Sequence, residues 1–341
     1  SQLFTRGLML RDFEDHRVHR RIMQTAFRTD ALAGYASLMN PVIETRLNEW
    51  GRQGQFELYP SLKALTLDMA ADAFIGISLG EKATRVNSAF VDTVAASIAV
   101  FKKEIPGLSF RRGMQGRRYL QRFFTDLIPS RRNSNQLDML SELCRARDED
   151  GSHYADDEIT DHMIFVMMAA HDTITSSLGT TLMMLARHPD WQERLRAEAC
   201  ALDTRHLAFE DCAQLEETEW AFEEALRMHP PVPLIPRRAV HYCQIGPYRI
   251  PGNTGVTVSS LMTHFLEDLW SNPQQFDPLR FAPERAEHKR HSHAFYPFGG
   301  GAHMCIGLHF ATMQMRLVMY QFLRRFRIHM VKTELPRIRP I

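Results

Sequence analysis

The sequence contains few cysteines, and their number and spacing do not suit a disulfide-bonded protein. There are five in 341 residues, an odd number, and no two of them form a C-x-x-C pair. Disulfide scaffolds use paired and closely spaced cysteines, so this pattern argues for reduced thiols. We therefore expect a cytoplasmic protein. The five are Cys144, Cys200, Cys212, Cys243 and Cys305.

The sequence also lacks a long apolar run and an excess of charge of either sign. Its longest uninterrupted apolar stretch, residues 163–170, is far shorter than the ~20 residues that a membrane helix needs. The 41 basic residues are balanced by 40 acidic ones, for a net charge of +1. No global field would attract nucleic acid. The sequence thus predicts neither a membrane segment in this chain nor a nucleic-acid partner.

The sequence does have the composition and periodicity of a large, mainly helical globular protein. It is 44% hydrophobic and 24% charged, which is ordinary for a soluble core. Breaks are expected at residues 51–54, 106–107 and 129, and Arg111, Arg117 and Arg131 are expected on solvated faces. Apolar spacing predicts helices at 10–28, 41–50, 61–74, 87–100, 116–127, 158–187, 215–229 and 306–323, and a small sheet of strands at 234–240, 248–250 and 255–259.

The stretch from Phe298 to Gly307, FGGGAHMCIG, combines a glycine-rich turn with one cysteine. Successive glycines allow unusual backbone conformations and let a large flat ligand approach the main chain. Cys305 precedes the predicted helix at 306–323. A thiolate at a helix N-terminus has a lowered pKa and ligates metals more readily. Taken alone, the residues also fit a buried, inert cysteine.

A family resemblance decides between these alternatives. Phe298, Gly301, His303, Cys305 and Gly307 match the Phe-x-x-Gly-x-Arg/His-x-Cys-x-Gly signature of the cytochrome P450 family. The resemblance implies that Cys305 is the axial thiolate ligand of haem b iron. It also implies that the loop, Gly299 included, contacts the haem. Most members have Arg where this chain has His303, and either residue can donate to a haem propionate.

Three further basic residues gain a role through the resemblance. His16 and Arg20 lie four residues apart on one helix face, where a solvated basic face would be an equal interpretation. They match the family's His-x-x-x-Arg pair, which binds haem propionates. Arg237 falls where the family has another propionate-binding arginine, with Arg238 as its close competitor.

The longest predicted helix carries Asp172 and Thr173 among apolar residues. A carboxylate in such a place costs free energy unless it is paired or functional, and Thr173 can bond to the carbonyl of Ala169. A satisfied structural pair is the simple interpretation. The two residues also match the family's Ala/Gly-Gly-x-Asp/Glu-Thr motif, with Ala170 in place of Gly. The resemblance implies that they relay protons during oxygen activation.

Glu224 and Arg227 lie one helical turn apart, as in an ordinary surface ion pair. They also coincide with the family's Glu-x-x-Arg motif, and Arg280 would complete a buried Glu–Arg–Arg network. Losing one partner of such a network leaves a buried charge unpaired, at about 3 to 5 kcal/mol. The resemblance implies that the network holds the cysteine loop in place.

The resemblance covers residues 1–341 as a single haem-thiolate monooxygenase domain of the soluble bacterial type. The implied fold is mainly α, a helical domain with a small β region enclosing haem. Family members have a further N-terminal stretch of sheet and helices, with a membrane anchor in some, and residues 334–341 stop within what resembles the C-terminal sheet. The chain is therefore expected to lack its N-terminal segment and its extreme C-terminus.

The implied reaction inserts one atom of O2 into an apolar small molecule, with electrons from a ferredoxin or flavoprotein. Sterol, terpenoid, retinoid and fatty-acid-like substrates all fit. Two alternatives remain. One is a haem-thiolate peroxygenase or isomerase, against which the Asp172–Thr173 pair argues; the other is a non-catalytic fragment unable to retain haem. The pocket-lining candidates are Phe165, Met168, Ala169, Leu234 and Ile235.

Overall fold

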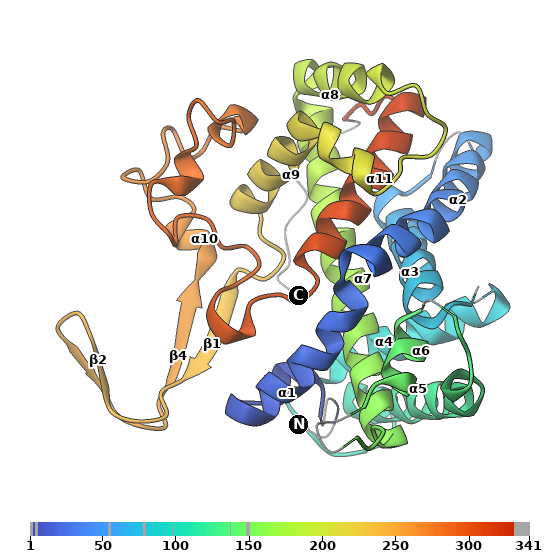
Figure 1. Ribbon diagram of the computed structural model, residues 1–341. Coiled ribbons are helices and arrows are strands. Elements are labelled where there is room, and N and C mark those ends of the chain that lie inside the picture. Colours follow the sequence, from blue (N-terminus) through green and yellow to red (C-terminus); the bar gives the residue numbers. More distant parts are fainter. Residues whose placement is uncertain are drawn as a thin grey trace. The chain divides into compact units, whose positions relative to one another are not determined.

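The computed structural model describes residue 3 and residues 6–53, 56–77, 80–97, 99–136, 138–147 and 151–330. The chain forms two compact units, each built from three stretches of sequence (Figure 1). Among the described residues, none of the helices is both long and apolar enough to cross a bilayer. The first unit comprises Ser1–Thr175, Asp203–Gln214 and Ile306–Arg324, and the second comprises Ser176–Leu202, Leu215–Cys305 and Arg325–Ile341.

The first unit is helical. Its core includes a cluster of aromatic rings in which Phe310 of the last helix stacks on Phe74, with ring centroids 4.7 Å apart, and meets Tyr35 edge-on at 5.8 Å. Such geometry adds to the burial of these large apolar surfaces. The helices are α1 (Phe13–Met23), α2 (Thr29–Gln53), α3 (Leu58–Ile75), α4 (Ala83–Ser97), α5 (Ser109–Arg132), α6 (Met139–Arg145), α7 (Asp156–Arg187), which continues into the second unit, and α11 (Leu308–Arg325).

Two glycines set the close approach of α4 and α5. A Cβ atom at Gly116 would lie 2.6 Å from the carbonyl oxygen of Ala89, and one at Gly113 would overlap the side chain of Ala96. Side chains at either position would push the helices apart. The same pair of helices is joined by Thr93 of α4, whose hydroxyl donates to the carbonyl of Gly113 in α5 at 3.3 Å.

Several helix limits differ from those predicted. Pro129 lies inside α5 and does not end it, and α2 begins at Thr29 and runs through Pro41. Proline disfavours a helix interior because it lacks an N–H. Buried side chains on both sides of Pro41, such as Met39 and Ile43 at 0% exposure, show how packing outweighs that preference.

Two arginines that were expected on solvated faces are instead buried, so that prediction was wrong. Arg117 is 5% exposed and its Nη2 donates to Asp161 Oδ1 at 2.9 Å. Arg131 is 6% exposed and donates to the Ile75 carbonyl at 2.8 Å. Both guanidinium groups have their partners on segments distant in the sequence, which local patterning does not reveal.

The second unit combines helices with two small antiparallel sheets rather than the one sheet that was predicted. In the first sheet Leu234 pairs with Ser259 and Arg238 pairs with Gly255. The second is a hairpin of β2 and β3, and of its two strands only β3 was predicted. Its elements are α8 (Pro189–Ala201), α9 (Glu216–Met228), β1 (Leu234–Arg238), β2 (Cys243–Ile245), β3 (Tyr248–Ile250), β4 (Gly255–Ser259), α10 (Ser260–Thr263) and the 3-10 turns η5 (Pro278–Arg280), η6 (Glu287–Lys289) and η7 (Gly301–His303).

The sequence pattern explains these elements. Proline at the first position of α8 and glutamates in the first turn of α9 are favourable at helix starts, where the macrodipole is positive. Strands β2 and β3 are joined by a turn at Gly246, whose φ of +56° suits glycine. The stretch expected at 334–341 to resemble the end of a sheet lies outside the described residues.

Candidate functional site

The cysteine loop of the second unit is closed by main-chain hydrogen bonds. The Cys305 N–H donates to the Phe298 carbonyl at 2.9 Å, and the Gly299 N–H donates to the Tyr296 carbonyl at 3.0 Å. Gly299 and Gly301 have φ angles of +74° and +71°, a region that favours glycine over residues with a Cβ. The main-chain bonds and φ angles of the loop therefore fix the position of the Cys305 backbone.

The glycines also leave the loop open to a ligand. A Cβ at Gly300 or Gly301 would meet no atom within 4 Å, and one at Gly299 would reach only the tip of Ile235 at 3.9 Å. The Cys305 side chain is exposed. An open, glycine-lined face beside an accessible thiol suits a flat prosthetic group that approaches the main chain.

The other cysteines fit the role of a metal ligand less well. Cys144 and Cys212 are buried, and burial raises the pKa of each thiol to about 11, so both are protonated at neutral pH. Cys200 and Cys243 are exposed, but neither lies in a glycine loop. Cys305 is thus the best placed of the five.

The donor set points to a metal that arrives with its own ligands. In the described part of the chain, no group of three or more His, Cys, Asp or Glu side chains could hold a metal ion. A porphyrin supplies four nitrogen ligands and needs an axial one from the protein, which a thiolate provides in some haem proteins. The residues at the loop therefore fit haem.

One part of the prediction at Cys305 needs correction. Helix α11 begins at Leu308, three residues after the cysteine, and not at Ile306. The Cys305 N–H is already used within the loop. Any stabilisation of the thiolate by unpaired helix N–H groups must therefore come from residues after Cys305 in the sequence.

The two candidate arginines of strand β1 differ in their contacts. Arg238 donates to the carbonyl of Asn253 at 3.2 Å and to its side-chain oxygen at 2.8 Å. The guanidinium of Arg237 is exposed and donates to the adjacent Pro236 carbonyl at 2.9 Å. Neighbouring residues of a strand point to opposite faces. Each guanidinium uses one nitrogen, Nη1, in these bonds, so both arginines stay candidates for an anionic ligand.

In the first unit, His16 and Arg20 both lie on α1. His16 is buried at 3% exposure, whereas Arg20 is partly exposed. The 10–28 helix that was predicted to carry them is shorter, since α1 begins at Phe13 and gives way to a 3-10 turn after Met23. The α-helical register from His16 to Arg20 is kept, so the two side chains share a face.

The predicted polar pair of α7 has defined partners. The Thr173 hydroxyl donates to the Ala169 carbonyl at 2.7 Å, as expected from the sequence. Asp172 Oδ1 lies 3.0 Å from Lys63 Nζ of α3 and 3.4 Å from His171 Nε2. Burial lowers the pKa of His171, so this imidazole is neutral at neutral pH. Lys63 was not singled out in the sequence, because its partner lies over a hundred residues away.

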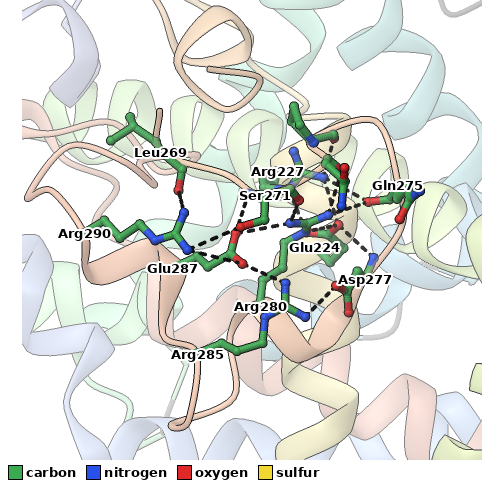
Figure 2. A network of polar contacts seen from close by, with 12 residues as sticks. Glu224, Arg227, Leu269, Ser271, Gln275, Asp277, Arg280, Arg285, Glu287 and Arg290 are labelled. Atoms are coloured by element: carbon green, nitrogen blue, oxygen red, sulfur yellow. Dashed lines mark hydrogen bonds and ion pairs between the residues drawn. The ribbon is translucent and has the colours of Figure 1, made fainter. Parts of the chain in front are cut away.

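The structure brings Glu224, Arg227 and Arg280 together in a buried network of the second unit (Figure 2). All three residues are 0% exposed. Arg227 binds Glu224 through two hydrogen bonds of 2.7 and 2.8 Å, and Arg280 Nε reaches the same carboxylate at 3.1 Å. The bidentate geometry is the strong form of an arginine–carboxylate pair.

Further donors of the two arginines bond to carbonyl groups. Arg227 Nη1 donates to His264 at 2.7 Å, and Arg280 Nη2 donates to Asn272 at 2.9 Å. The Arg227 guanidinium also lies 5.3 Å from the ring centres of Phe265 and Trp270. Buried charge is tolerated because hydrogen bonds and aromatic faces replace water.

Glu287 joins this network and was not recognised in the sequence. It is 1% exposed, and its carboxylate lies 3.2 Å from Arg280 Nη1 and 2.7 Å from Arg285 Nη2. Burial alone raises the pKa of Glu287. The bonds from Arg285 and the Ser271 N–H and the charge of Arg280 outweigh burial and lower the pKa to about 2. Local sequence carried no signal, since Glu287 begins a 3-10 turn of only three residues.

Comparisons with known proteins agree with this architecture. A family model described as Cytochrome P450 matches residues 2–340. The protein named cytochrome P450 136 of Mycobacterium tuberculosis is 40% identical over 336 residues, which are 97% of this chain and 68% of that protein. Pentalenene oxygenase of Streptomyces avermitilis is 31% identical over 332 residues, which are 94% of this chain and 74% of that protein.

Among solved structures, retinoic acid bound cyanobacterial CYP120A1 matches with a TM-score of 0.86 and 27% identity, over 95% of this chain and 74% of that one. The chain belongs to the cytochrome P450 family. It is a haem-thiolate monooxygenase at the level of the family, with haem b as cofactor and with O2, an apolar substrate and a redox partner as its reactants. The predicted family and helical fold are thereby confirmed.

Proposed function

We propose that Cys305 is the axial ligand of haem iron in this chain. The observation that carries the proposal is the loop itself, closed from the Cys305 N–H to the Phe298 carbonyl and open along its glycines. Gly307 follows the cysteine without adding bulk, and Phe298 lies at the base of the loop. Bound haem supplies the iron that, on receiving electrons, activates O2 for insertion of one oxygen atom into the substrate.

We assign the haem propionates to basic residues of this chain. Arg237 is exposed and retains donors beyond its bond to Pro236, while His303 follows the glycines within η7. His16 and Arg20 share one face of α1. Charge-assisted hydrogen bonds from such groups are the strong ones for carboxylates, so each of these residues is a candidate partner for a propionate.

We assign proton delivery to Asp172 and Thr173. The Thr173 hydroxyl donates to the Ala169 carbonyl, and a hydroxyl can both donate and accept hydrogen bonds, as a proton relay requires. The Asp172 carboxylate is held by Lys63 on one oxygen, which leaves its second oxygen for a proton. A positioned acid of this kind contributes about 100-fold or more to a rate-limiting proton transfer.

The substrate that we propose is an apolar terpenoid or retinoid. Two similar proteins are named for pentalenene and for bound retinoic acid, and both are isoprenoid hydrocarbons or their derivatives. Candidate lining residues of β1 are apolar, with Leu234 56% exposed. For the electron donor we propose a ferredoxin or flavoprotein, and for the location the cytoplasm, where the thiols stay reduced.

A carbon monoxide difference spectrum of the reduced, haem-loaded protein tests the assignment. We expect the Soret shift of a thiolate-ligated haem in the wild type and its loss in Cys305→Ala and Cys305→His. Cys243→Ser is the matched control, because Cys243 is equally an exposed cysteine of the second unit. Retention of the thiolate signal in both Cys305 variants would exclude the assignment.

A further inference from the structure

His264 connects the buried ion network to the cysteine loop within the second unit. The residue follows helix α10 and is 0% exposed. Its carbonyl accepts from Arg227 Nη1 at 2.7 Å, and its ring nitrogen Nδ1 lies 3.1 Å from the Arg227 carbonyl. The other ring nitrogen, Nε2, accepts from the Tyr296 N–H at 3.2 Å. The His264 side chain thus bonds to the main chain of Arg227 in the ion network and to the main chain of Tyr296 beside the cysteine loop.

The partners determine which ring nitrogen carries the proton. A backbone N–H can only donate, so Nε2 must be the unprotonated acceptor toward Tyr296. A carbonyl can only accept, so Nδ1 carries the proton and donates to Arg227. Burial lowers the pKa of His264 to about 4, an effect to which the nearby Arg227 charge adds and against which the bond to the Arg227 carbonyl works. The imidazole is therefore neutral, with both nitrogens satisfied.

Tyr296 lies at the base of the cysteine loop. Its carbonyl accepts from the Gly299 N–H at 3.0 Å, and the loop then closes between Phe298 and Cys305 at 2.9 Å. The Tyr296 hydroxyl donates to the Ser259 carbonyl at 3.1 Å. The hydrogen bond from Tyr296 to His264 is thus a direct link between the start of this loop and the rigid network around Arg227.

We propose that His264 is a positioning residue for the Cys305 thiolate, acting by accepting the Tyr296 N–H and so fixing the loop to the Glu224–Arg227 network. The proposal rests on the assignment of Cys305 as haem ligand. His264 itself touches neither the cysteine nor the site of reaction. Its contribution is to the geometry of the ligand, which must be held by supporting hydrogen bonds to stay productive.

Two near-isosteric variants separate this role from general packing. In His264→Gln the side-chain oxygen can occupy the Nε2 position and accept from Tyr296. In His264→Asn the side-chain amide can occupy the Nδ1 position and donate to Arg227, while the Tyr296 N–H loses its acceptor. His188→Gln is the control, because the half-buried His188 ring stacks on Phe276 in the same unit.

Three readouts are measured on the full chain: haem bound per chain, the fraction of reduced haem with the thiolate-type carbon monoxide spectrum, and amide hydrogen exchange over residues 296–305. We expect His264→Asn to lose roughly half or more of the thiolate-type signal and to exchange these amides about tenfold faster. His264→Gln should stay close to the wild type in all three, as should His188→Gln.

The proposal is overturned if His264→Asn matches the wild type, or if the two variants lose signal equally. Insoluble His264→Gln also counts against it, because that variant keeps the bond to Tyr296. Insoluble His264→Asn beside soluble, haem-binding His264→Gln supports it. If the wild type itself shows no thiolate signal, the assignment of Cys305 fails, while the hydrogen-exchange comparison still reports on His264.

Discussion

The buried network around Glu224 and the polar pair at Asp172 show two ways of placing a carboxylate inside a protein. Glu224 is 0% exposed and accepts from Arg227, Arg280 and the Asp277 N–H. Asp172 is partly exposed, with a side-chain exposure of 16%, and its contacts to Lys63 and to the neutral His171 both reach Oδ1. The first carboxylate is closed on all sides, whereas the second keeps an oxygen available.

The difference separates a fully bonded charge from one that keeps an oxygen for the proton delivery that we propose. A fully bonded buried charge resists any change of partner, because every bond lost leaves a desolvated group. A carboxylate with a flexible lysine as partner can exchange that contact at small cost. Local sequence reveals only part of this distinction: Arg227 lies one turn from Glu224, whereas Lys63, the partner of Asp172, is distant in the sequence.

The largest effect should come from breaking the closed network. We expect Glu224→Ala or Arg227→Ala to lower the free energy of unfolding by about 3 to 5 kcal/mol, since each leaves a buried charge unpaired. Arg327→Ala is the control, because its ion pair with Glu193 is exposed and should be worth under ~1 kcal/mol. Urea titration with haem quantification measures both. Equal effects in the two variants and the control would remove the distinction between the regions.

The second-largest effect should be the loss of turnover when the Asp172 carboxylate is removed. Asp172→Asn keeps shape but removes the titratable group, so we expect product formation to fall by about 100-fold with an altered pH dependence. Haem content should stay as in the wild type. Steady-state rates across pH, normalised to bound haem, provide the measurement. Wild-type rates and profile in the variant would assign Asp172 to helix architecture.

Thr173→Ala sharpens the same comparison through the coupling of electrons to product. We expect electron consumption to continue while product falls and hydrogen peroxide rises, because oxygen activation proceeds without a correctly placed proton. Thr181→Ala on the same helix is a control, since the Thr181 hydroxyl bonds in the same way to the carbonyl four residues earlier. Product and peroxide per electron are measured, and unchanged coupling in Thr173→Ala contradicts the role.

Acidification should weaken the closed network in two windows. Burial lowers the pKa of the His264 imidazole from 6.5 to about 4. The neutral ring therefore stabilises the folded state above pH 6.5, and this stabilisation is lost as the pH falls toward 4. Glu287, lowered from 4.5 to about 2, contributes above 4.5 and loses that contribution toward pH 2. The contribution of His264 to the free energy of unfolding is up to about 3 kcal/mol. Urea midpoints of wild type and His264→Gln, compared across pH, should converge below pH 4; parallel curves would contradict the assignment.

The smallest effect should come from removing the ion pair between Lys63 and Asp172. In Lys63→Gln we expect a change in turnover of only a few-fold, because Asp172 is partly exposed and water can replace the lysine. The free energy of unfolding should change by under ~1 kcal/mol. A loss as large as that of Asp172→Asn would show that the ion pair, and not the carboxylate alone, carries the function.

The predictability of these features from sequence depended on how local their determinants are. The loop from Phe298 to Gly307 and the Asp172–Thr173 pair occupy a few consecutive residues, and Thr173 bonds within its own helix. The family and the mainly helical fold could be recognised from such stretches. The partners Lys63, Glu287 and His264 come from distant segments, so their contacts exist only after folding.

The limits of individual elements were less predictable for a related reason. Pro129 was expected to end a helix, yet α5 continues to Arg132 because buried neighbours such as Ile128, at 0% exposure, outweigh the local preference. Arg117 looked solvated until Asp161 was found beside it. In each case tertiary packing overrides a tendency that is weak when taken alone.

The loop that closes from the Cys305 amide to the Phe298 carbonyl has a use in protein engineering. Main-chain atoms hold it, and Gly299, Gly301 and His303 are the positions between its ends to which backbone conformation or a proposed ligand role gives a definite residue. Ala302 is exposed there, so it could be exchanged for a reporter group while the main-chain bonds that define the turn are kept. A fluorophore or spin label installed at Ala302 would place a probe within three residues of the thiol and would register cofactor loading in real time.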